Sequence, residues 1–365
     1  MRPLFFNSLL LIVGIILVIL VIFVSGSAET YGAESNPTGN PIGGGAGYSG
    51  IITATDAGVK YVVSTKEELL IALKDAKAGE TVFVSGTSVI DMTGTPSVTI
   101  PAGVTLAGDR GLSGSSGALI KRTQNLAGTW EEAMFIAGGD DVRITGLQLE
   151  GEMKPQDDES VEDQYYLVGI YAENRTGFEV DNCEIRGWSW SGVSLREDKN
   201  AHIHHNYIHH NQARGEGYGT NLYGGTALIE ANLYEYNRHD ITGAGMPGEG
   251  YEARYNLILG KGDATGASHF DVHKDEEAGS GLAGNLYKIH HNTFEPSRPM
   301  AVGIRAVPRT GVSVDHNIFK GSITDSEGGV PIYQSGGKGK MYVTDNYWKG
   351  DLISGDTIVW YISES

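Results

Sequence analysis

A short pattern repeats along most of this 365-residue chain: alternating apolar residues, then an asparagine, then a second short apolar stretch. It occurs in TGFEVDNCEIRG (176–187), KNAHIHHNYIHH (199–210), LYKIHHNTFEP (286–296) and TGVSVDHNIFKG (310–321). Apolar residues recur at every second position, which is typical of β-strands and excludes helical repeats. Most gaps between the repeated asparagines are 24 to 29 residues and one is 36; these residues are Asn182, Asn206, Asn232, Asn256, Asn292, Asn317 and Asn346. A period in the twenties made of short strands indicates a solenoid of stacked coils.

The repeat predicts an all-β fold, a parallel β-helix, because the leucine pattern of leucine-rich repeats is missing. Asparagine suits one corner of each coil, since it tolerates a left-handed backbone and its amide can bond to the asparagine of the next coil. We therefore expect an asparagine ladder, with Gly108 and Gly146 at the same corner of earlier coils. The 52 glycines agree with the many tight turns that such coils need.

The segment STKEELLIALKDA predicts a helix that covers the open N-terminal end of the solenoid. Ser64 is a helix-capping residue type, and Glu67 follows it three residues later, which is the spacing of a capping box. The apolar face expected to rest on the first coil consists of Leu69, Leu70, Ala72 and Leu73.

The cap helix, the AGETVFVSG that follows it, the later PAGVTLAGDRG and the asparagine repeats together resemble the pectate-lyase-like superfamily of right-handed parallel β-helix proteins. The resemblance covers roughly residues 59 to 350. It implies a right-handed, single-stranded parallel β-helix domain over residues 59–365, with the helix as its N-terminal cap. It implies no single function, because lyases, hydrolases, epimerases, phage tailspikes and adhesins share this fold.

The first 28 residues predict export. Residues 4–24 are apolar apart from Asn7 and Ser8, and they lead into SGSAET. A small-residue cleavage site ends at Ala28, while the length of the apolar run also suits a membrane anchor, so both stay open. Residues 29–58, rich in Gly, Ser and Thr, predict a flexible spacer. We expect an extracellular or cell-surface protein whose only membrane contact is an uncleaved N-terminal segment.

The chain is acidic, which limits its partners. The formal net charge is −18 at pH 7, and removal of residues 1–28 deletes Arg2 and no acid, which gives −19. Such a charge argues against nucleic acid as a partner. Cys183 is the only cysteine, so no internal disulfide can form, and its place after a repeated asparagine predicts a buried thiol. We expect a monomer.

Each coil also carries a strand ahead of its asparagine, such as HDITG (239–243), HFDVH (269–273) and VGIRA (302–306). Aligning the central apolar residues of these strands predicts an inward stack of Ile170, Val193, Leu222, Ile241, Val272, Ile304 and Ile332. In this register Asp240 lies beside Asp271, and His273 lies beside Arg305, with coils about 4.8 Å apart. Further outward residues of the same face are Tyr223, Arg238 and His269.

This outward face predicts an active site, because the repeat does not require ionisable groups there. Two carboxylates at this separation repel by about 3 kcal/mol at an effective dielectric constant near 20, so either one takes a proton or a cation lies between them. We expect Ca²⁺ as that cation, bound by Asp240 and Asp271, since an exported protein meets Ca²⁺ and this ion prefers oxygen ligands. His273 is then the general acid/base and Arg305 a fixed positive charge.

The stretch FDVHKD is similar to the Asp-Pro-His-acidic motif of mannuronan C5-epimerases, with Asp271 and His273 in the matching places. It departs from that motif at Val272, where the family has proline, and at Ser268, where the family has tyrosine. A downstream arginine of that family would correspond to Arg305. The resemblance implies a lyase or an epimerase that removes the C5 proton from a unit of an acidic, uronic-acid polysaccharide.

The stretch IRAVPRTG resembles the arginine and proline segment of pectate lyases through Arg305, Pro308 and Arg309. This resemblance adds Arg309 to the substrate-binding residues that we expect, which are Arg238, His269, Tyr223 and Arg309.

Two other functions stay open. An inverting polysaccharide hydrolase would use Asp240 and Asp271 as its two carboxyl groups, although inverting carboxyl groups stand further apart. A non-catalytic cell-surface solenoid would use the same charges as ion pairs between coils. All 11 histidines lie between residues 202 and 316, and several directly precede a repeated asparagine. We therefore assign most histidines to the repeat rather than to a metal centre.

Overall fold

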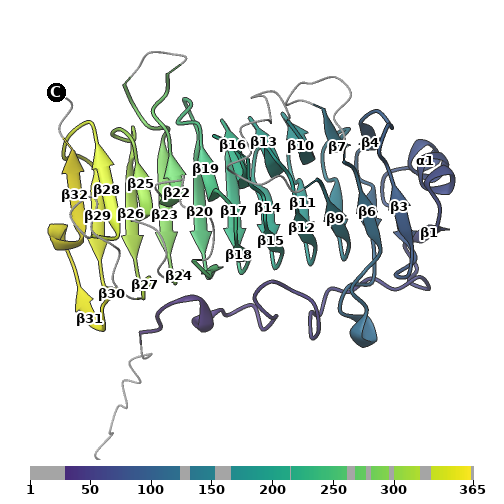
Figure 1. Cartoon of the computed structure of the whole chain (residues 1–365), viewed down its shortest axis with the longest axis horizontal. Coiled ribbons are helices and arrows are strands. Elements are labelled where there is room, and N and C mark those ends of the chain that lie inside the picture. The colour runs from purple at the N-terminus through teal and green to yellow at the C-terminus, as the bar shows by residue number, and fades with distance from the viewer. Residues whose placement is uncertain are drawn as a thin grey trace, which may run out of the picture.

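The computed structural model describes residues 29–123, 132–152, 166–213, 215–260, 268–276, 281–295, 300–320 and 330–362. Within them the chain winds through three sheets that run along the long axis of the molecule (Figure 1). Each strand pairs with its counterparts one coil before and one coil after. The described pairs are parallel, except that β30 and β31 at the C-terminal end are antiparallel. The expected all-β solenoid of stacked coils is confirmed.

The sheets are named A, B and C. Sheet A contains β1 (Val59–Val63), β2 (Thr81–Val84), β5 (Thr105–Ala107), β8 (Arg143–Thr145), β11 (Glu179–Asp181), β14 (Ala201–His204), β17 (Thr226–Glu230), β20 (Gly250–Arg254), β23 (Leu286–His290), β26 (Gly311–Asp315) and β29 (Met341–Thr344). Sheet B contains β3 (Val89–Asp91), β6 (Leu119–Lys121), β9 (Gln148–Glu150), β12 (Glu184–Arg186), β15 (Tyr207–His209), β18 (Leu233–Glu235), β21 (Leu257–Ile258), β24 (Thr293–Phe294), β27 (Ile318–Phe319), β30 (Asn346–Trp348) and β31 (Asp351–Ile353). Sheet C contains β4 (Val98–Ile100), β7 (Ala133–Ala137), β10 (Val168–Glu173), β13 (Ser191–Arg196), β16 (Tyr218–Tyr223), β19 (His239–Gly243), β22 (Ser268–Val272), β25 (Met300–Ile304), β28 (Ile332–Ser335) and β32 (Val359–Ile362). The helical elements are α1 (Lys66–Asp75) and three single 3₁₀ turns, η1 (Ala33–Ser35), η2 (Leu112–Gly114) and η3 (Asp356–Ile358).

The core lies between the three sheets and follows from the alternation of apolar residues. In sheet A, Val180, Ile203 and Ile229 pair in register on successive coils and are completely buried. The residues between them along each strand, such as His202 and Leu228, lie on the outward face and are half-buried. A strand in this fold therefore buries one face and presents the other to solvent or substrate.

Helix α1 covers the N-terminal end of the solenoid, beside β1 (Figure 1). Its N-cap is Thr65, not Ser64, and the capping-box partner is Glu68, not Glu67. The Thr65 hydroxyl accepts a hydrogen bond from the Glu68 amide at 3.3 Å, and the Glu68 carboxylate accepts one from the Thr65 amide at 3.2 Å. The expected boundary was wrong by one residue, because Ser and Thr are adjacent and each is followed by a glutamate at the right distance. The buried residues of the helix are Leu69, Ala72 and Leu73, as expected, while Leu70, which was expected on the same face, is half-buried.

Six asparagines form the expected ladder. The side-chain amide of each of the first five donates to the carboxamide oxygen of the next at 3.0 or 3.1 Å, and the members are Asn206, Asn232, Asn256, Asn292, Asn317 and Asn346. Asn182 does not belong to the ladder. In its coil the ladder position is filled by Cys183, whose amide donates to the Asn206 side chain at 2.9 Å. Cys183 is buried, as expected.

The left-handed residue at this corner is the one before each ladder asparagine, not the asparagine itself. His205, Tyr255 and His316 have φ values of 51°, 55° and 53°. Asn182, at 51°, and Gly146, at 70°, lie at this same preceding position. The amide hydrogen bonds therefore explain the asparagines. The left-handed backbone that we expected at each asparagine belongs to the residue before it.

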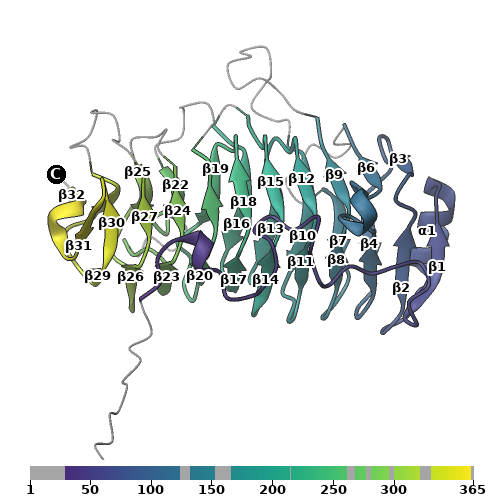
Figure 2. The ribbon, with the colours of Figure 1, turned by 90° about the horizontal axis from the view of Figure 1, so that it is seen from below.

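Residues 29–58 lie along the outside of the solenoid and are not the free spacer that their composition suggested (Figures 1 and 2). We call residues 29–50 the N-terminal arm. The arm runs back across the coils from the β27 end toward β5, and its amides and one hydroxyl bond to the corner of the coils. These bonds are Gly32 N to His316 O (3.1 Å), Gly43 N to Ala231 O (2.9 Å), Gly45 N to Asn182 Oδ1 (2.7 Å) and Tyr48 OH to Asp181 Oδ2 (2.9 Å).

The expected export segment, residues 1–28, lies outside the described residues. Among the residues that are described, no helix is both long and apolar enough to cross a membrane.

Candidate active site

The predicted site lies on the outward face of sheet C, but its register differs from the expected one. Ile241 pairs with Phe270, and Thr242 pairs with Asp271. The expected alignment placed Ile241 beside Val272, which is two residues away. The true inward stack is Ile170, Val193, Thr220, Ile241, Phe270, Val302 and Ile332. Asp240 is therefore not beside Asp271.

Two features explain the errors: Thr220 is a polar residue at an inward position, and in β22 and β25 two apolar residues, such as Phe270 and Val272, compete for the same position. The Thr220 hydroxyl is completely buried and bonds to the hydroxyl of Tyr234 at 3.1 Å inside the core. The pattern of apolar residues favoured the neighbouring Leu222 for this position. Each shift of two residues keeps the same face of a strand inward, so alternation alone cannot distinguish the two registers.

Asp240 and His269 form an internal pair, although both were expected on the substrate-binding face. Asp240 Oδ2 lies 2.6 Å from His269 Nδ1, and both side chains are almost fully buried. Asp240 Oδ1 accepts a hydrogen bond from Asn237 at 2.8 Å, and Asn237 also accepts one from Asn211 in a second, shorter ladder. Asp240 thus ends a structural ladder. The predicted Ca²⁺ site, in which Asp240 and Asp271 would share one ion, does not fit this arrangement, because each carboxylate bonds to other side chains.

Asp271 is the centre of the outward cluster, although its side chain is fully buried. Its Oδ1 accepts a hydrogen bond from Nε of Arg305 at 2.9 Å, and Oδ2 is bound by the second guanidinium arm. His273 Nε2 lies 3.1 Å from Oδ2, and His239 Nε2 lies 3.6 Å from the same oxygen. The expected neighbours His273 and Arg305 both contact Asp271, which links them.

The cluster has strong electrostatic effects. Burial alone would raise the pKa of Asp271, but the hydrogen bond from His273 and the charges of His239 and Arg305 outweigh it and hold this pKa well below its usual range. Burial would lower the pKa of Arg305, but Asp271 and Tyr333 raise it above its usual value. Asp271 is therefore a carboxylate, and Arg305 is a guanidinium, at any pH near neutrality.

The protonation of His273 follows from its partner. An ionised carboxylate only accepts hydrogen bonds, so a neutral His273 carries its proton on Nε2 toward Asp271. The Nδ1 lone pair is then the one that can accept a proton. The side chain of His273 is 37% exposed, so a substrate on this face can reach it. This orientation of an imidazole by a buried aspartate is the geometry of a general base.

The sequence reasoning missed three residues of this face: His239, Tyr218 and Glu216. It expected Tyr333 on this face but gave it no role in the site. The ring of Tyr218 stacks on His239 with 6.0 Å between ring centres. Burial raises the pKa of Glu216, while a hydrogen bond with Tyr218 and the charges of Arg238 and His273 act to lower it. Correct pairing of β16 with β19 would have found His239 and Tyr218, since Tyr218 pairs with His239.

Gly303 makes room for Tyr333 next to Asp271. Gly303 pairs with Asp271 on one side and with Tyr333 on the other. A Cβ atom at Gly303 would lie 2.2 Å from the ring of Tyr333. The absence of a side chain therefore lets the tyrosine ring lie over β25, toward Arg305.

The remaining predicted residues are less central. Arg238 is near Glu216, at the edge of the cluster. Tyr223 lies in the outer row of β16, under the guanidinium of Arg196 at 4.9 Å. Arg309 is turned toward Gly284 and Asp275, with its Nη2 3.9 Å from the Asp275 carboxylate, so it joins a turn and not the cluster.

Comparisons with known proteins agree with this architecture. A family model described as a right-handed beta helix region matches residues 157–260. Among solved structures, an alginate lyase from Paenibacillus sp. str. FPU-7 matches with a TM-score of 0.50 and 15% identity, covering 82% of this chain and 99% of that chain. The chain is a right-handed parallel β-helix protein. The fold expected from the resemblance is confirmed.

Two other solved structures are similar to it at lower scores. A DFA-IIIase from Arthrobacter chlorophenolicus A6 has a TM-score of 0.47 and 12% identity, covering 83% of this chain and 87% of that chain. The A-module of a mannuronan C-5 epimerase from Azotobacter vinelandii has a TM-score of 0.40 and 13% identity, covering 81% of this chain and 93% of that chain. No curated protein sequence matches this β-helix protein.

Proposed function

We propose that this β-helix protein acts on an acidic polysaccharide and removes the C5 proton of a uronate unit, as a lyase or an epimerase. The observation that carries the proposal is the cluster of Asp271, His273 and Arg305 on an outward face. A reaction of this kind needs a base beside a positive charge that binds the uronate carboxylate. His273 and Arg305 are adjacent and both are 37% exposed.

Each residue has a separate role in this proposal. His273 accepts the C5 proton on Nδ1, because Asp271 keeps its Nε2 proton in place. Arg305 uses two N–H groups on Asp271, and its remaining N–H groups can bind the substrate carboxylate and withdraw charge from C5. Asp271 is a positioning residue, since it is buried and contacts the two others.

A row of aromatic rings leads along the solenoid axis into this cluster and supports a polymeric substrate. Tyr166 contacts Trp190 edge to face at 4.9 Å, and Trp190 contacts Tyr218 at 5.7 Å, before the stack of Tyr218 on His239. These rings come from successive coils. Tyr166 and Trp190 are half-buried while Tyr218 and His239 are buried, so a chain of sugars lying along the axis could contact the first two rings.

The geometry disfavours the inverting hydrolase. That mechanism needs two carboxyl groups facing one substrate, and Asp240 is bonded to Asn237 and His269 away from Asp271.

Fold alone does not decide between catalysis and binding. A solved protein of this fold is an alginate lyase, which supports a lyase on such a scaffold. We also propose that the protein is exported and that residues 1–28 are its signal peptide or membrane anchor.

The test measures absorbance of unsaturated uronate during incubation with alginate, pectate and other uronans, each with Ca²⁺ and with chelator. A rise in absorbance is expected on one polymer class. His273→Gln is expected to lower the rate by about 100-fold or more, the usual contribution of a general base. In deuterated water, deuterium at C5 without a rise in absorbance would instead identify an epimerase.

The matched control is His290→Gln, which removes a histidine from the outward face of sheet A, where His290 bonds to Glu252. It is expected to keep full activity. Unchanged polymer in both measurements would contradict the proposal and leave plain binding, whereas equal activity of wild type and His273→Gln would show that His273 is not the base.

A further inference from the structure

Three strands carry a His-His-Asn arrangement, and they differ in one residue. In β14, β15 and β23, the first histidine bonds to its neighbour through their Nδ1 atoms, at 2.8, 2.6 and 2.9 Å. Its Nε2 faces a glutamate on the preceding coil, at 3.1, 3.3 and 3.3 Å. The repeat therefore explains these histidines, which are His204, His209 and His290.

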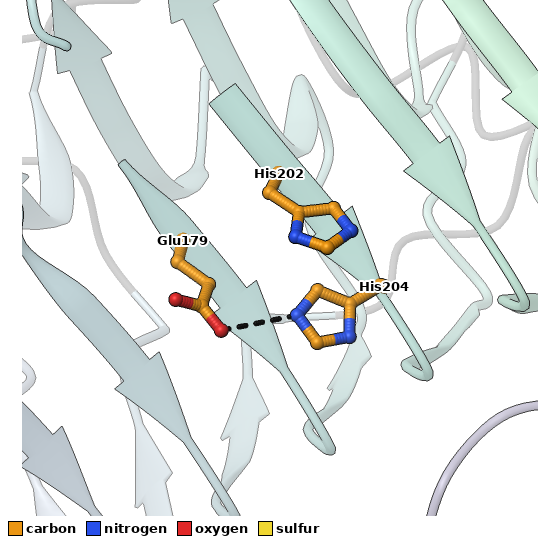
Figure 3. Close-up of side chains that lie close together, drawn as sticks. All are labelled: Glu179, His202 and His204. Carbon is orange, nitrogen blue, oxygen red and sulfur yellow. Dashed lines mark hydrogen bonds and ion pairs between the residues drawn. The ribbon is translucent and has the colours of Figure 1, made fainter. Parts of the chain in front are cut away.

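The outward residue two positions earlier differs between the copies: it is Tyr207 in β15, Lys288 in β23 and His202 in β14. Only the β14 copy therefore presents two imidazoles. The rings of His202 and His204 stack with 3.9 Å between their centres, and Glu179 of β11 faces them (Figure 3). Glu179, His202 and His204 each offer one ligand atom, and these three atoms lie within 4.8 Å of one another.

Carboxylates flank the two histidines from both neighbouring coils. Glu230 of β17 lies 2.9 Å from His202 Nε2, and Glu179 of β11 lies 3.1 Å from His204 Nε2. Both carboxylates are ionised. The hydrogen bond from His204 is the main cause that lowers the pKa of Glu179. Burial would raise the pKa of Glu230, but bonds from His202 and Arg254 lower it to about 2.

The two nearby arginines do not neutralise this group fully. Arg143 makes two hydrogen bonds to the buried Asp181, at 2.7 and 2.8 Å, and reaches Glu179 at 3.3 Å. Arg254 binds Oε2 of Glu230 at 2.7 Å and so turns Oε1 toward His202. Three carboxylates thus meet two guanidinium groups, which leaves the face of the two imidazoles negative.

His204 is supported from behind, as metal-binding histidines usually are. Its Nδ1 lies 2.8 Å from Nδ1 of His205, whose Nε2 is 2.9 Å from the Thr38 hydroxyl of the N-terminal arm. The Nε2 of His204 now donates to Glu179. When a metal ion replaces that proton, His204 can carry its proton on Nδ1 and donate it to Nδ1 of His205, which orients the ring.

We propose that His202, His204 and Glu179 bind one divalent transition-metal ion of the Zn²⁺ type, with Glu230 beside it. Two imidazoles and a carboxylate are donors that suit Zn²⁺ better than Ca²⁺. Ligand atoms that lie about 2.0 to 2.2 Å from a tetrahedral Zn²⁺ are about 3.4 Å from one another, so atoms already within 4.8 Å need only small side-chain rotations. The ion joins β11 to β14 and does not depend on the proposed active site, which lies on sheet C.

The test uses the protein without a histidine tag, titrated with Zn²⁺ by calorimetry and with Co²⁺ by visible absorption. One ion per chain is expected, with a d–d band in the Co²⁺ spectrum. His202→Lys, which copies β23, is expected to lower the affinity by at least about 100-fold. Zn²⁺ at 100 times its Kd is expected to raise the Tm of the wild type by about 3 °C and not that of His202→Lys.

The matched control is His290→Gln, which removes a histidine from the copy that has Lys288 in place of a second imidazole. It is expected to bind one ion with unchanged affinity. His202→Tyr, which copies β15, is a second variant in case His202→Lys does not fold. No stoichiometric binding by the wild type, or equal binding by a folded His202 variant, would overturn the proposal.

Discussion

Asp271 is ionised although its side chain is completely buried, and its partners explain why. Arg305 binds both of its oxygens, and His273 and His239 approach one of them. A buried carboxylate with such partners stabilises the folded state, and loss of the carboxylate leaves the arginine unpaired. The same contacts orient the imidazole that we propose as the base.

Asp271→Asn is therefore expected to lower the free energy of unfolding by about 2 to 3 kcal/mol at pH 7, less than a fully buried pair because Arg305 is partly exposed. The pKa of Asp271 is lower in the folded than in the unfolded state, so its contribution is fully present above about pH 5 and shrinks as the pH falls below about 4. Urea unfolding at pH 7, 5 and 3 measures this. Asp315→Asn, which removes a half-buried partner of His316, is the control and should cost under about 1 kcal/mol.

At the scale of one structural element, the asparagine ladder shows how the coils are joined where the chain turns. Each of the first five ladder amides donates to the next asparagine and also to a backbone carbonyl, as Asn256 does to Asn292 and to Ile229 O at 2.9 Å. Cys183 occupies the same position, and its thiol points to the matching carbonyl of Ile144 at 3.7 Å. An asparagine at 183 would thus find both ladder partners in place.

Asn256→Ala is expected to lower the free energy of unfolding by about 2 to 3 kcal/mol, because it leaves buried groups of Asn232 and Ile229 without partners. Cys183→Asn is expected to change it by less than about 1 kcal/mol, because the new amide extends the ladder by one coil. Denaturant unfolding of both variants gives the comparison. A large loss for Cys183→Asn would show that this corner needs a small apolar group.

At the scale of the whole molecule, the N-terminal arm connects coils that are far apart in the sequence. Its contacts reach from His316 near one end to Asp181 in the middle of the solenoid (Figures 1 and 2). Two of its amides bond to the carbonyls of left-handed corner residues, His316 and Ala231. Composition rich in Gly and Thr made it appear flexible, and the same small residues let it lie close to the coils.

Hydrogen exchange of the full chain tests this docking. The amides of Gly32, Gly43 and Gly45 are expected to exchange at least about 100-fold more slowly than in an unstructured peptide, because each is bonded to the solenoid. Tyr48→Phe, which removes the bond to Asp181, is expected to reduce protection at Gly45 more than at Gly32. Exchange of all three amides at the free-peptide rate would mean that the arm is undocked.

The repeated pattern determined that the chain forms a solenoid of parallel strands with an asparagine ladder, and the segment STKEELLIALKDA determined the cap helix. Alternation with a period of two decides which face of a strand is inward, and the ladder spacing determines the length of each coil. Asp271, His273 and Arg305 could be found from it because they lie outward on strands that the pattern identifies.

Tertiary packing decided the rest. A shift of two residues leaves every inward residue inward, so only contacts across the core, such as Thr220 with Tyr234 and Phe270 with Phe294, set the register of sheet C. That register separated Asp240 from Asp271 and brought His239 and Tyr218 to the site. The docking of the arm and the meeting of Glu179 with His202 and His204 depend likewise on contacts between coils, which no local pattern in the sequence records.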